Sequence, residues 1–263
     1  MASIFGLIVS TAYIGLTGLI AWWARKLVDK ICLKLTVRKI LLLEAIATWE
    51  LCASCFELII VADNYGVTTY ALYLFLLTIW WSRNWGDATA CPYTHVEELV
   101  EGKTWISHAI VKILSQLAGG LLTYRYILYL WSLEVSPNHR GRAYEACTAD
   151  LQVSAVVGAI IEGCATCICR TLSRALAEVE TKFGSEFEAF VGTTLVVAAF
   201  NYSGGYFNPA LATSLKYGCA GHSVPEHIFV YWIGSSAGAV ASIYMFELPS
   251  IKSMVAKYKI KPE

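Results

Sequence analysis

The chain has 263 residues, of which 57% are hydrophobic and 15% are charged, and its 20 basic and 20 acidic side chains give a formal net charge of zero. Such a composition is too apolar for an ordinary soluble domain and too neutral for a nucleic-acid-binding protein. It favours a polytopic membrane protein whose main partner is the lipid bilayer, with no nucleic acid among its partners.

The first predicted element is an uncharged run over residues 3–24, close to the ~20 residues that a spanning helix needs. No Lys or Arg precedes this run, and a basic segment follows it up to residue 39. A secretory signal carries its positive charge in front of the apolar run. We therefore expect residues 1–39 to form a retained, extra N-terminal transmembrane helix and a basic cytosolic segment, with the N-terminus outside the cytosol.

Six further apolar runs follow in two groups of three. The first group covers residues 40–62, 66–81 and 105–131, and the second covers residues 151–169, 187–202 and 228–246. We expect a channel domain over residues 40–246, with repeats 40–131 and 151–246, and a cytosolic tail over residues 247–263. The polar residues 63–64, 132–150 and 170–185 are expected to be connections.

Seven spans with an external N-terminus collect most basic residues on one side of the membrane. The segment after the first helix, the 82–103 loop, the 170–185 connection and the tail fall in the cytosol, whereas only Arg140 and Arg142 fall clearly on the far side. An excess of Lys and Arg in cytosolic segments is the usual pattern, and it supports this orientation.

Two short motifs predict helices that begin inside the bilayer. Asn208-Pro209-Ala210 follows Gly204-Gly205, so it combines a good N-cap with a first-turn proline. Cys91-Pro92-Tyr93 places a proline in the same position of the first repeat. Broken backbone at membrane depth is tolerated only where protein buries it or where it lines a watery cavity. Both motifs therefore predict half-helices that line a pore or a site, although each would also suit an ordinary surface helix.

An internal repeat favours the pore. Glu44 and Glu162 both begin the pattern Glu-x-x-Ala-Thr inside an apolar run, and they precede Cys91 and Asn208 by 47 and 46 residues. Two halves of this kind are typical of inverted-repeat transporters and channels. The two loops would enter from opposite sides, and the positive ends of the two half-helices would repel cations while neutral polar molecules pass.

These residues resemble the aquaporin family. The second motif after a glycine pair, the two Glu-bearing spans and the small residues 234–238 of the last span carry the likeness, which covers about residues 40–246. Cys91-Pro92-Tyr93 in place of the first motif, together with the extra N-terminal span, is similar to the superaquaporins of the eleven and twelve type. The resemblance implies an all-α fold of six transmembrane helices in an inverted repeat plus two re-entrant half-helices, with one extra helix here.

The resemblance also implies a homotetramer without a cofactor, with a pore in each subunit for water, glycerol or hydrogen peroxide. It implies an intracellular membrane such as the endoplasmic reticulum, with the plasma membrane as the alternative. By the same resemblance Asn208 donates a hydrogen bond to the permeating molecule. Glu44 and Glu162 accept hydrogen bonds from the loop amides, although pairing of these carboxylates with Lys112 or Arg125 remains open.

Departures from the common pattern shape the expected pore. Leu211 stands where common aquaporins have the filter arginine, and Gly205 supplies no side chain at the other loop position of the filter, so we expect a wider and more apolar filter. Cys91 replaces an amide with a thiol, which is a weak donor. Glu97, Glu98 and Glu101 oppose the helix dipole at the end of the first half-helix, and we expect that end to face the cytosol.

The nine cysteines suggest three further hypotheses. Cys91 and His95 are four residues apart, which suggests a redox gate in which His95 assists thiolate formation. A disulfide between Cys147 and Cys219 on the far side is open. The cluster at residues 164, 167 and 169 is more typical of helix packing than of a metal site, so no metal is expected.

Three function classes fit a chain of this kind. A channel for small neutral solutes fits best, and a non-conducting scaffold or organelle-homeostasis protein with the same fold is the alternative. A seven-helix receptor would not need re-entrant prolines or matched Glu-bearing halves. No nucleophile, base and orienting group form a convincing set in the sequence, so an enzyme is not expected.

Overall fold

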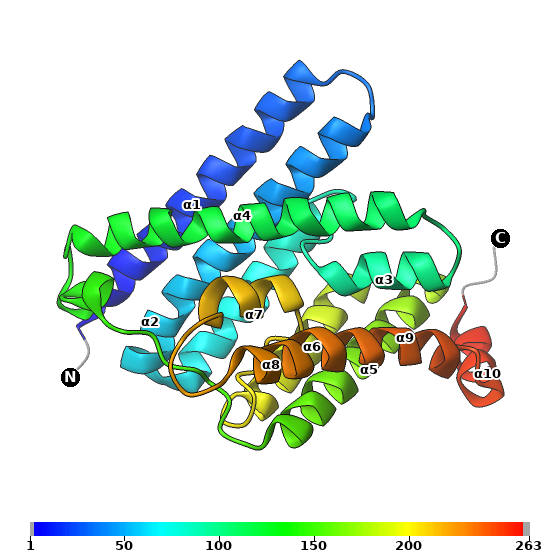
Figure 1. Cartoon of the computed structure of the whole chain (residues 1–263). Helices are drawn as coiled ribbons and strands as arrows, with labels where there is room; N and C mark the ends of the chain where they lie inside the picture. Colours follow the sequence, from blue (N-terminus) through cyan, green and yellow to red (C-terminus); the bar gives the residue numbers. More distant parts are fainter. Residues whose placement is uncertain (1–2, 260–263) are drawn as a thin grey trace.

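The computed structural model describes residues 3–259, and this part of the chain is helical apart from its connections. The helices are α1 (Ile4–Ile31), α2 (Val37–Asn84), α3 (Pro92–Val100), α4 (Ile106–Ser132), η1 (Pro137–His139), η2 (Arg142–Tyr144), α5 (Ala155–Val179), α6 (Gly184–Ala199), α7 (Pro209–Lys216), α8 (Val224–His227), the π-helical segment η3 (Ile228–Gly234), α9 (Ser235–Phe246) and α10 (Pro249–Tyr258). Figure 1 shows α4, α5 and α9 running side to side through the molecule, with the short helices α3 and α7 between them.

Five helices in the described part are long and apolar enough to cross a membrane. They are α1, α2, α4, α5 and the continuous stretch Val224–Phe246. Helix α2 provides two passes, because its 48 residues contain a break at Gly66, where φ is 81° and ψ is 167°. The turn expected at residues 63–64 therefore lies slightly later, at the residue that adopts a positive φ at least cost. Helix α6 has 16 residues, which corresponds to about 24 Å of helix.

The two repeats pack in the same way. Helix α4 lies against the first half of α2, and α9 lies against α5. A Cβ on Gly119 would lie 2.1 Å from the carbonyl oxygen of Ala45, and a Cβ on Gly238 would lie 2.0 Å from that of Gly163. Ala45 and Gly163 are the residues directly after the two repeated glutamates. Equivalent glycines thus bring equivalent helix pairs into close contact, as an inverted repeat requires.

Helix α5 extends further than the sequence suggests. The prediction of a span ending at residue 169 and a charged connection over 170–185 is wrong, because α5 continues to Val179. Arg170 and Arg174 lie inside the helix, where Arg170 pairs with Glu97 of α3 and Arg174 pairs with Glu101, the C-cap of α3. The tail also contains α10, whose Val255 is buried against Val179 and Phe246.

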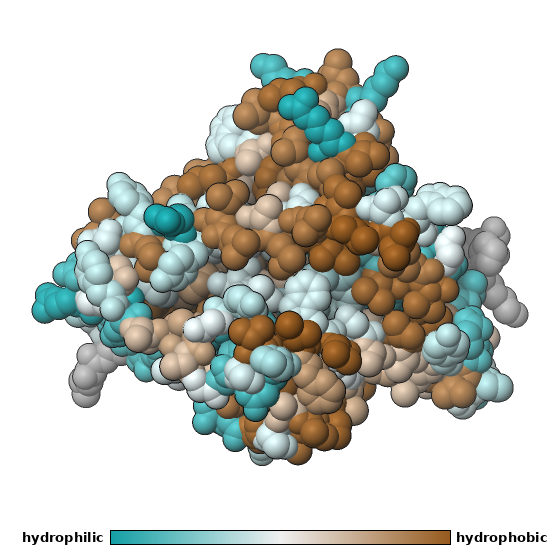
Figure 2. Space-filling view, viewed as in Figure 1, coloured by the Kyte–Doolittle hydropathy of each residue, from teal (hydrophilic) through white to brown (hydrophobic). Residues whose placement is uncertain are grey.

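The outer surface matches a membrane environment. Figure 1 shows the hairpin of α1 and the start of α2, in blue, projecting beyond the rest of the bundle. Figure 2 shows brown, hydrophobic surface over this hairpin and across the middle of the molecule, with teal, hydrophilic side chains at the tip of the hairpin. Exposed apolar side chains on α1 and α4 include Leu19, Leu27, Leu121 and Leu122. Apolar surface of this extent is suited to contact with lipid.

Candidate permeation site

The two half-helices begin at prolines and are joined at their starts. Cys91 is the N-cap of α3 and Asn208 is the N-cap of α7, and a proline occupies the first turn of each helix. The side-chain nitrogen Nδ2 of Asn208 donates a hydrogen bond to the carbonyl oxygen of Ala90, with a distance of 2.9 Å. This bond holds the two helix starts together in the interior of the molecule.

Asn208 has two roles in this arrangement. Its Oδ1 atom accepts hydrogen bonds from the backbone N–H groups of Ala210 and Leu211, at 3.0 and 3.2 Å, and so caps α7. An amide nitrogen carries two N–H donors, so the bond to Ala90 leaves one for another acceptor. Cys91 makes no such side-chain cap on α3. The second half-helix, α7, is therefore better capped at its start than the first, α3.

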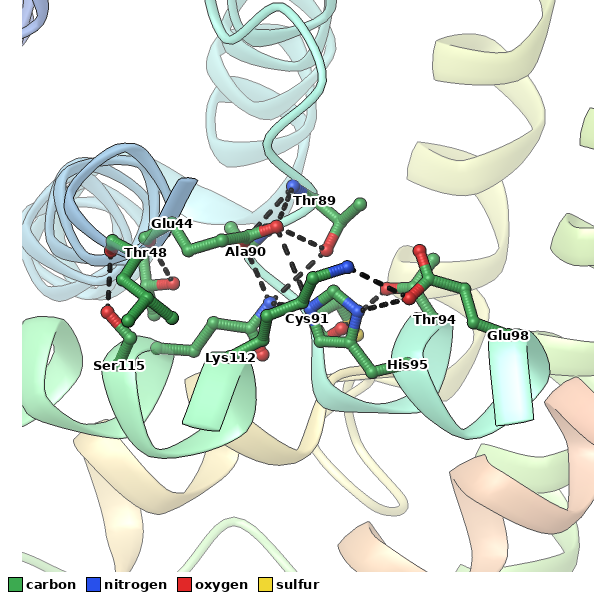
Figure 3. A network of polar contacts seen from close by, with 12 residues as sticks. Glu44, Thr48, Thr89, Ala90, Cys91, Thr94, His95, Glu98, Lys112 and Ser115 are labelled. Atoms are coloured by element: carbon green, nitrogen blue, oxygen red, sulfur yellow. Dashed lines mark hydrogen bonds and ion pairs between the residues drawn. The ribbon is translucent and has the colours of Figure 1, made fainter. Parts of the chain in front are cut away.

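Glu44 holds the loop that precedes α3. Its carboxylate accepts hydrogen bonds from the backbone N–H groups of Thr89 and Ala90, at 3.1 and 3.0 Å, as Figure 3 shows. Gln116 on α4 donates to the same carboxylate at 2.8 Å. These bonds satisfy backbone donors that have no water to bind at membrane depth. Lys112, an alternative partner for Glu44, instead pairs with Glu98 at 3.0 Å.

Glu162 holds the opposite loop in the same way. It accepts hydrogen bonds from the backbone N–H groups of Tyr206 and Phe207, at 3.2 and 2.6 Å, and from the hydroxyl of Ser203, at 2.7 Å. In both repeats the bound amides lie two residues and one residue before the N-cap. The residues directly before the N-caps, Ala90 and Phe207, both have positive φ, at 52° and 45°. The two loops thus share one strained turn and one carboxylate clamp.

Two cavities meet at the half-helices. The first has a volume of about 370 Å³ and is lined by Cys91, Tyr93 and Asn208 among others. The second has a volume of about 490 Å³ and is lined by polar groups that include Asp63, Asp150 and Gln152. Five residues line both cavities: Cys55, Tyr70, Gly205, Tyr206 and Leu211. These five residues, called the waist below, lie where the two cavities, called the first and second chambers below, adjoin.

Comparison with known proteins agrees with this geometry. No protein-family model matches the chain. Aquaporin-11 of Milnesium tardigradum is 28% identical over 217 residues, which are 82% of this chain and 78% of that protein. Aquaporin-12 of Mus musculus is 23% identical over 211 residues, which are 77% of this chain and 73% of that protein. The X-ray structure of the aquaglyceroporin from Plasmodium falciparum has the same fold, with a TM-score of 0.59 at 13% identity, and the match covers 84% of this chain and all of that one.

The chain is similar in sequence to aquaporins of the eleven and twelve type and has the aquaporin fold. This resemblance and this fold, both expected from the sequence, are confirmed. The carboxylate clamps and paired half-helices described above are the features that the internal repeat of the chain predicts. The remaining features concern the places where this chain departs from the common pattern.

Gly205 does not widen the waist in the way that its lack of a side chain suggests. A Cβ at this position would lie 2.7 Å from the carbonyl oxygen of Val196 and 3.1 Å from its Cα, so it would point into the backbone of α6. The φ angle of Gly205 is also positive, at 64°. Glycine is therefore required here by packing, and the waist obtains its width from other residues.

Gly205→Ala should lower the stability of the protein. The added methyl group must displace α6 and sits on unfavourable backbone, which together cost about 2 to 4 kcal/mol. Thermal unfolding of the detergent-solubilised protein measures the change. Gly192→Ala is the matched control, because nothing lies within 4 Å of a Cβ at Gly192 on the same helix. Equal unfolding temperatures for the two variants would contradict the packing argument.

The waist is completed by side chains that sequence reasoning did not identify. Tyr70 comes from the second half of α2 and packs edge-on against Phe200, with ring centroids 5.1 Å apart. The hydroxyl of Tyr206 bonds Asp150 at 2.5 Å, and Lys216 pairs with the same carboxylate at 2.9 Å. Leu211 faces both cavities without a charge. The waist thus combines two tyrosines with Cys55, Gly205 and Leu211, and none of its five residues carries a guanidinium.

A disulfide bond lies three residues before Asp150, which lines the second chamber. Cys147 and Cys219 are bonded, which resolves the open question about this pair and joins the α4–α5 connection to the end of α7. Thr148 and Ala220 form the β-bridge next to it, and the amide of Ala149 donates to the carbonyl of Ala220 at 2.7 Å. This crosslink positions Asp150, and through it Tyr206 at the waist.

The three glutamates at the end of α3 are paired with basic side chains, and Glu97 is buried, while the expectation that this end of the helix faces the cytosol stays a prediction. Glu97 is 2% exposed, and the guanidinium of Arg170 on α5 binds it through Nη2 at 2.6 Å and Nε at 3.0 Å. Arg174 binds Glu101 at 2.5 Å and approaches Glu97 at 3.3 Å. The arginines that the sequence seemed to place in a connection therefore neutralise α3, and the half-helix packs inside the bundle.

The ring nitrogens of His95 are engaged by residues other than Cys91. The Nδ1 atom of His95 lies 3.1 Å from Glu98, which Figure 3 shows beside it, and Nε2 lies 3.1 Å from Gln116. These contacts do not favour the redox gate in which His95 assists Cys91, which stays a hypothesis. Cys91 itself is 6% exposed and lines the first cavity.

Two further glutamates of α2 were missed. Glu50 pairs with Arg25 of α1 at 2.6 Å and accepts hydrogen bonds from the indoles of Trp80 and Trp85 at 3.1 and 2.9 Å. In this way it attaches the extra N-terminal helix to the channel. The spacing of six residues from Glu44 was a visible signal, because an intramembrane carboxylate needs a partner.

Glu57 ties the far end of α2 to the α4–α5 connection. It bonds the indole nitrogen of Trp131 at 2.9 Å and His139 at 2.8 Å. Ser136 bonds the other ring nitrogen of His139 at 2.7 Å. All of these groups are buried, and they serve packing. Within residues 3–259, no group of three or more His, Cys, Asp or Glu side chains has the arrangement of a metal site.

Proposed function

We propose that this protein is a membrane channel that passes water and small neutral solutes, glycerol and hydrogen peroxide among them, through a pore in each subunit. The observation that carries the proposal is the pair of cavities that meet at the waist beside both half-helices. The relatives named above and the fold support a channel. In this pore Cys91, Pro92 and Tyr93 form the first motif and Asn208, Pro209 and Ala210 form the second.

The proposed selectivity follows from the waist. The Leu211 side chain carries no charge and no hydrogen-bond donor, and Gly205 contributes only backbone. The carbon atoms of a solute such as glycerol can therefore contact the waist without displacing water from a charged group. Tyr70 and Tyr206 can hydrogen-bond hydroxyl groups. The remaining N–H donor of Asn208 then serves the permeating molecule beside the half-helix dipoles, which disfavour cations.

We further propose that the chain forms a homotetramer in an intracellular membrane, with the N-terminus outside the cytosol and α10 in the cytosol. The basic residues near the ends of α1 and α10 support this orientation. Light scattering of the detergent-solubilised protein tests the tetramer, and protease protection of tagged microsomes tests the orientation.

Flux measurements test the channel directly. The purified protein is reconstituted into liposomes, and stopped-flow light scattering compares water and glycerol flux with that of empty vesicles, while an enclosed dye reports peroxide. Flux above the empty vesicles for at least one solute supports the channel. No flux for any of the three would favour the alternative, a non-conducting scaffold. The hydrogen bond from Asn208 to Ala90 favours that alternative, because it occupies one of the N–H donors that would otherwise face a permeating molecule.

Leu211→Arg should convert the waist toward a water filter. The guanidinium adds a fixed charge and five donors in a narrow passage, so we expect glycerol flux to fall by about tenfold or more while water flux changes less. Leu211→Met is the matched control, because it keeps the volume and the neutral charge, and its glycerol flux should stay close to that of the unmodified protein. Unchanged glycerol flux in Leu211→Arg would place the selective step elsewhere.

A further inference from the structure

A third cavity lies beside the pore, between the α1–α2 hairpin and the ends of α2, α3 and α4. Its volume is about 540 Å³. Trp85 and Thr89 line both this cavity and the first chamber of the pore, so the loop before α3 forms a wall between them. The groups at this wall include Glu44, His95 and Lys112, which Figure 3 shows at close range.

The cavity gathers basic side chains from three helices. Those that line it are Arg25, Lys26, Lys39, Arg83 and Lys112. Four carboxylates line it too: Asp29, Glu44, Asp87 and Glu98. Ion pairs balance most of these charges, because Lys39 pairs with Asp29 at 2.8 Å, Lys112 pairs with Glu98 at 3.0 Å, and Arg25 pairs with Glu50 at 2.6 Å. The hairpin segment that forms one side, residues 25–39, carries six basic residues and one acidic residue, so the excess positive charge lies on that side of the cavity.

Arg25 lines this cavity, and one of its guanidinium nitrogens has no partner among residues 3–259. The residue is 6% exposed, and its Nη1 atom is bound to Glu50. Its Nη2 atom is buried and has no hydrogen-bond partner in the part of the chain that the structure describes. A buried guanidinium nitrogen without an acceptor is costly, and the planar guanidinium is well suited to phosphate oxygens.

The other half of the cavity is apolar. Trp22, Leu35, Ile40 and Leu43 line it together with the cations. Trp22 also lines an adjoining cavity of about 570 Å³ between α1 and α2, whose other lining residues are largely apolar and include Ile14, Leu19 and Leu77. The ammonium of Lys26 lies 5.7 Å from the centre of the Trp22 ring. An occupant that fits both cavities has an anionic head and an apolar chain.

We propose that these cavities form a binding site for an anionic phospholipid from the leaflet on the side of α10. Its phosphate lies against Arg25, Lys26 and Lys39, and one acyl chain passes Trp22 into the apolar cavity between α1 and α2. A free phosphate ion would leave the apolar cavity unfilled, and a zwitterionic lipid would gain less from the basic hairpin. The site does not require the pore to conduct.

Binding is tested on the purified full-length protein in a neutral detergent. Dioctanoyl phosphatidylserine is the probe, and tryptophan fluorescence is the signal because Trp22 and Trp85 line the cavity. We expect saturable binding that is about tenfold tighter than that of dioctanoyl phosphatidylcholine, with little competition from millimolar inorganic phosphate. Equal binding of the two lipids would overturn the proposal. Complete displacement by inorganic phosphate would also overturn it, in favour of a soluble anion.

A pair of matched variants separates the site from general surface charge. Lys26→Gln/Lys39→Gln removes two cations that line the cavity, and Lys30→Gln/Lys34→Gln removes two exposed cations of the same segment that do not. We expect the first variant to weaken phosphatidylserine binding by about tenfold or more and the second by about threefold or less. Equal losses in the two variants would show that charge alone attracts the lipid and would overturn the site.

Discussion

Glu162→Ala is expected to prevent the second half of the channel from folding stably. The carboxylate is fully buried and is the acceptor for the backbone N–H groups of Tyr206 and Phe207. Leaving two buried backbone donors without an acceptor costs about 2 to 6 kcal/mol, a large fraction of the stability of a typical domain. We expect little monodisperse protein by size-exclusion chromatography and a clearly lower unfolding temperature.

Two variants make this result specific to the clamp. Glu162→Gln keeps one oxygen acceptor and should lose less stability than Glu162→Ala. Glu145→Ala is the control for removal of a glutamate, because Glu145 is exposed and pairs only with Arg142, at 2.9 Å in the described structure; it should change stability by less than about 0.5 kcal/mol. If Glu162→Ala behaved like Glu145→Ala, the clamp would not hold the loop.

Arg170→Met should release α3 from the bundle. Glu97 is buried and receives three hydrogen bonds from Arg170. Loss of the guanidinium leaves its carboxylate with the longer contacts to Arg174, at 3.3 Å, and to the hydroxyl of Ser242, at 3.4 Å. Removing one partner of a buried ion pair costs about 3 to 5 kcal/mol, because the other charge remains desolvated. The unfolding temperature and the water flux of liposomes should both fall.

A double variant tests the cause of that loss. Arg170→Met/Glu97→Gln removes both charges, so its stability should exceed that of Arg170→Met alone. Lys103→Met breaks an exposed pair with Glu101, in which the Lys103 side chain is 64% exposed, and should cost less than about 1 kcal/mol. If the losses from Arg170→Met and Glu97→Gln simply added in the double variant, the two residues would not act as a pair.

Ion pairs explain how three glutamates at the end of a half-helix can lie against the other helices of the bundle. Glu97 and Glu98 of α3 pair with cations of α5 and α4, and Glu101, the C-cap of α3, pairs with Arg174 of α5. The second half-helix needs no such shell, because α7 carries no acidic residue. The first repeat thus surrounds α3 with polar partners, while its N-cap Cys91 makes no side-chain cap.

The sequence alone was enough to predict the inverted repeat and the family. Glu44 and Glu162 recur at nearly equal distances before two proline motifs, and hydrophobic length and charge bias define the spans. These signals are local or periodic, so they can be recognised in the sequence without a structure. The helix caps at Cys91 and Asn208 follow from the same local chemistry.

The tertiary structure decided the partners of the charged groups. Whether Arg170 ends a helix or neutralises Glu97, 73 residues away, depends on how α3 and α5 pack. The direction in which a Cβ of Gly205 would point likewise depends on the position of α6. Spacing in sequence fixes what lies on one helix face, but a contact between helices depends on packing geometry that no single segment encodes.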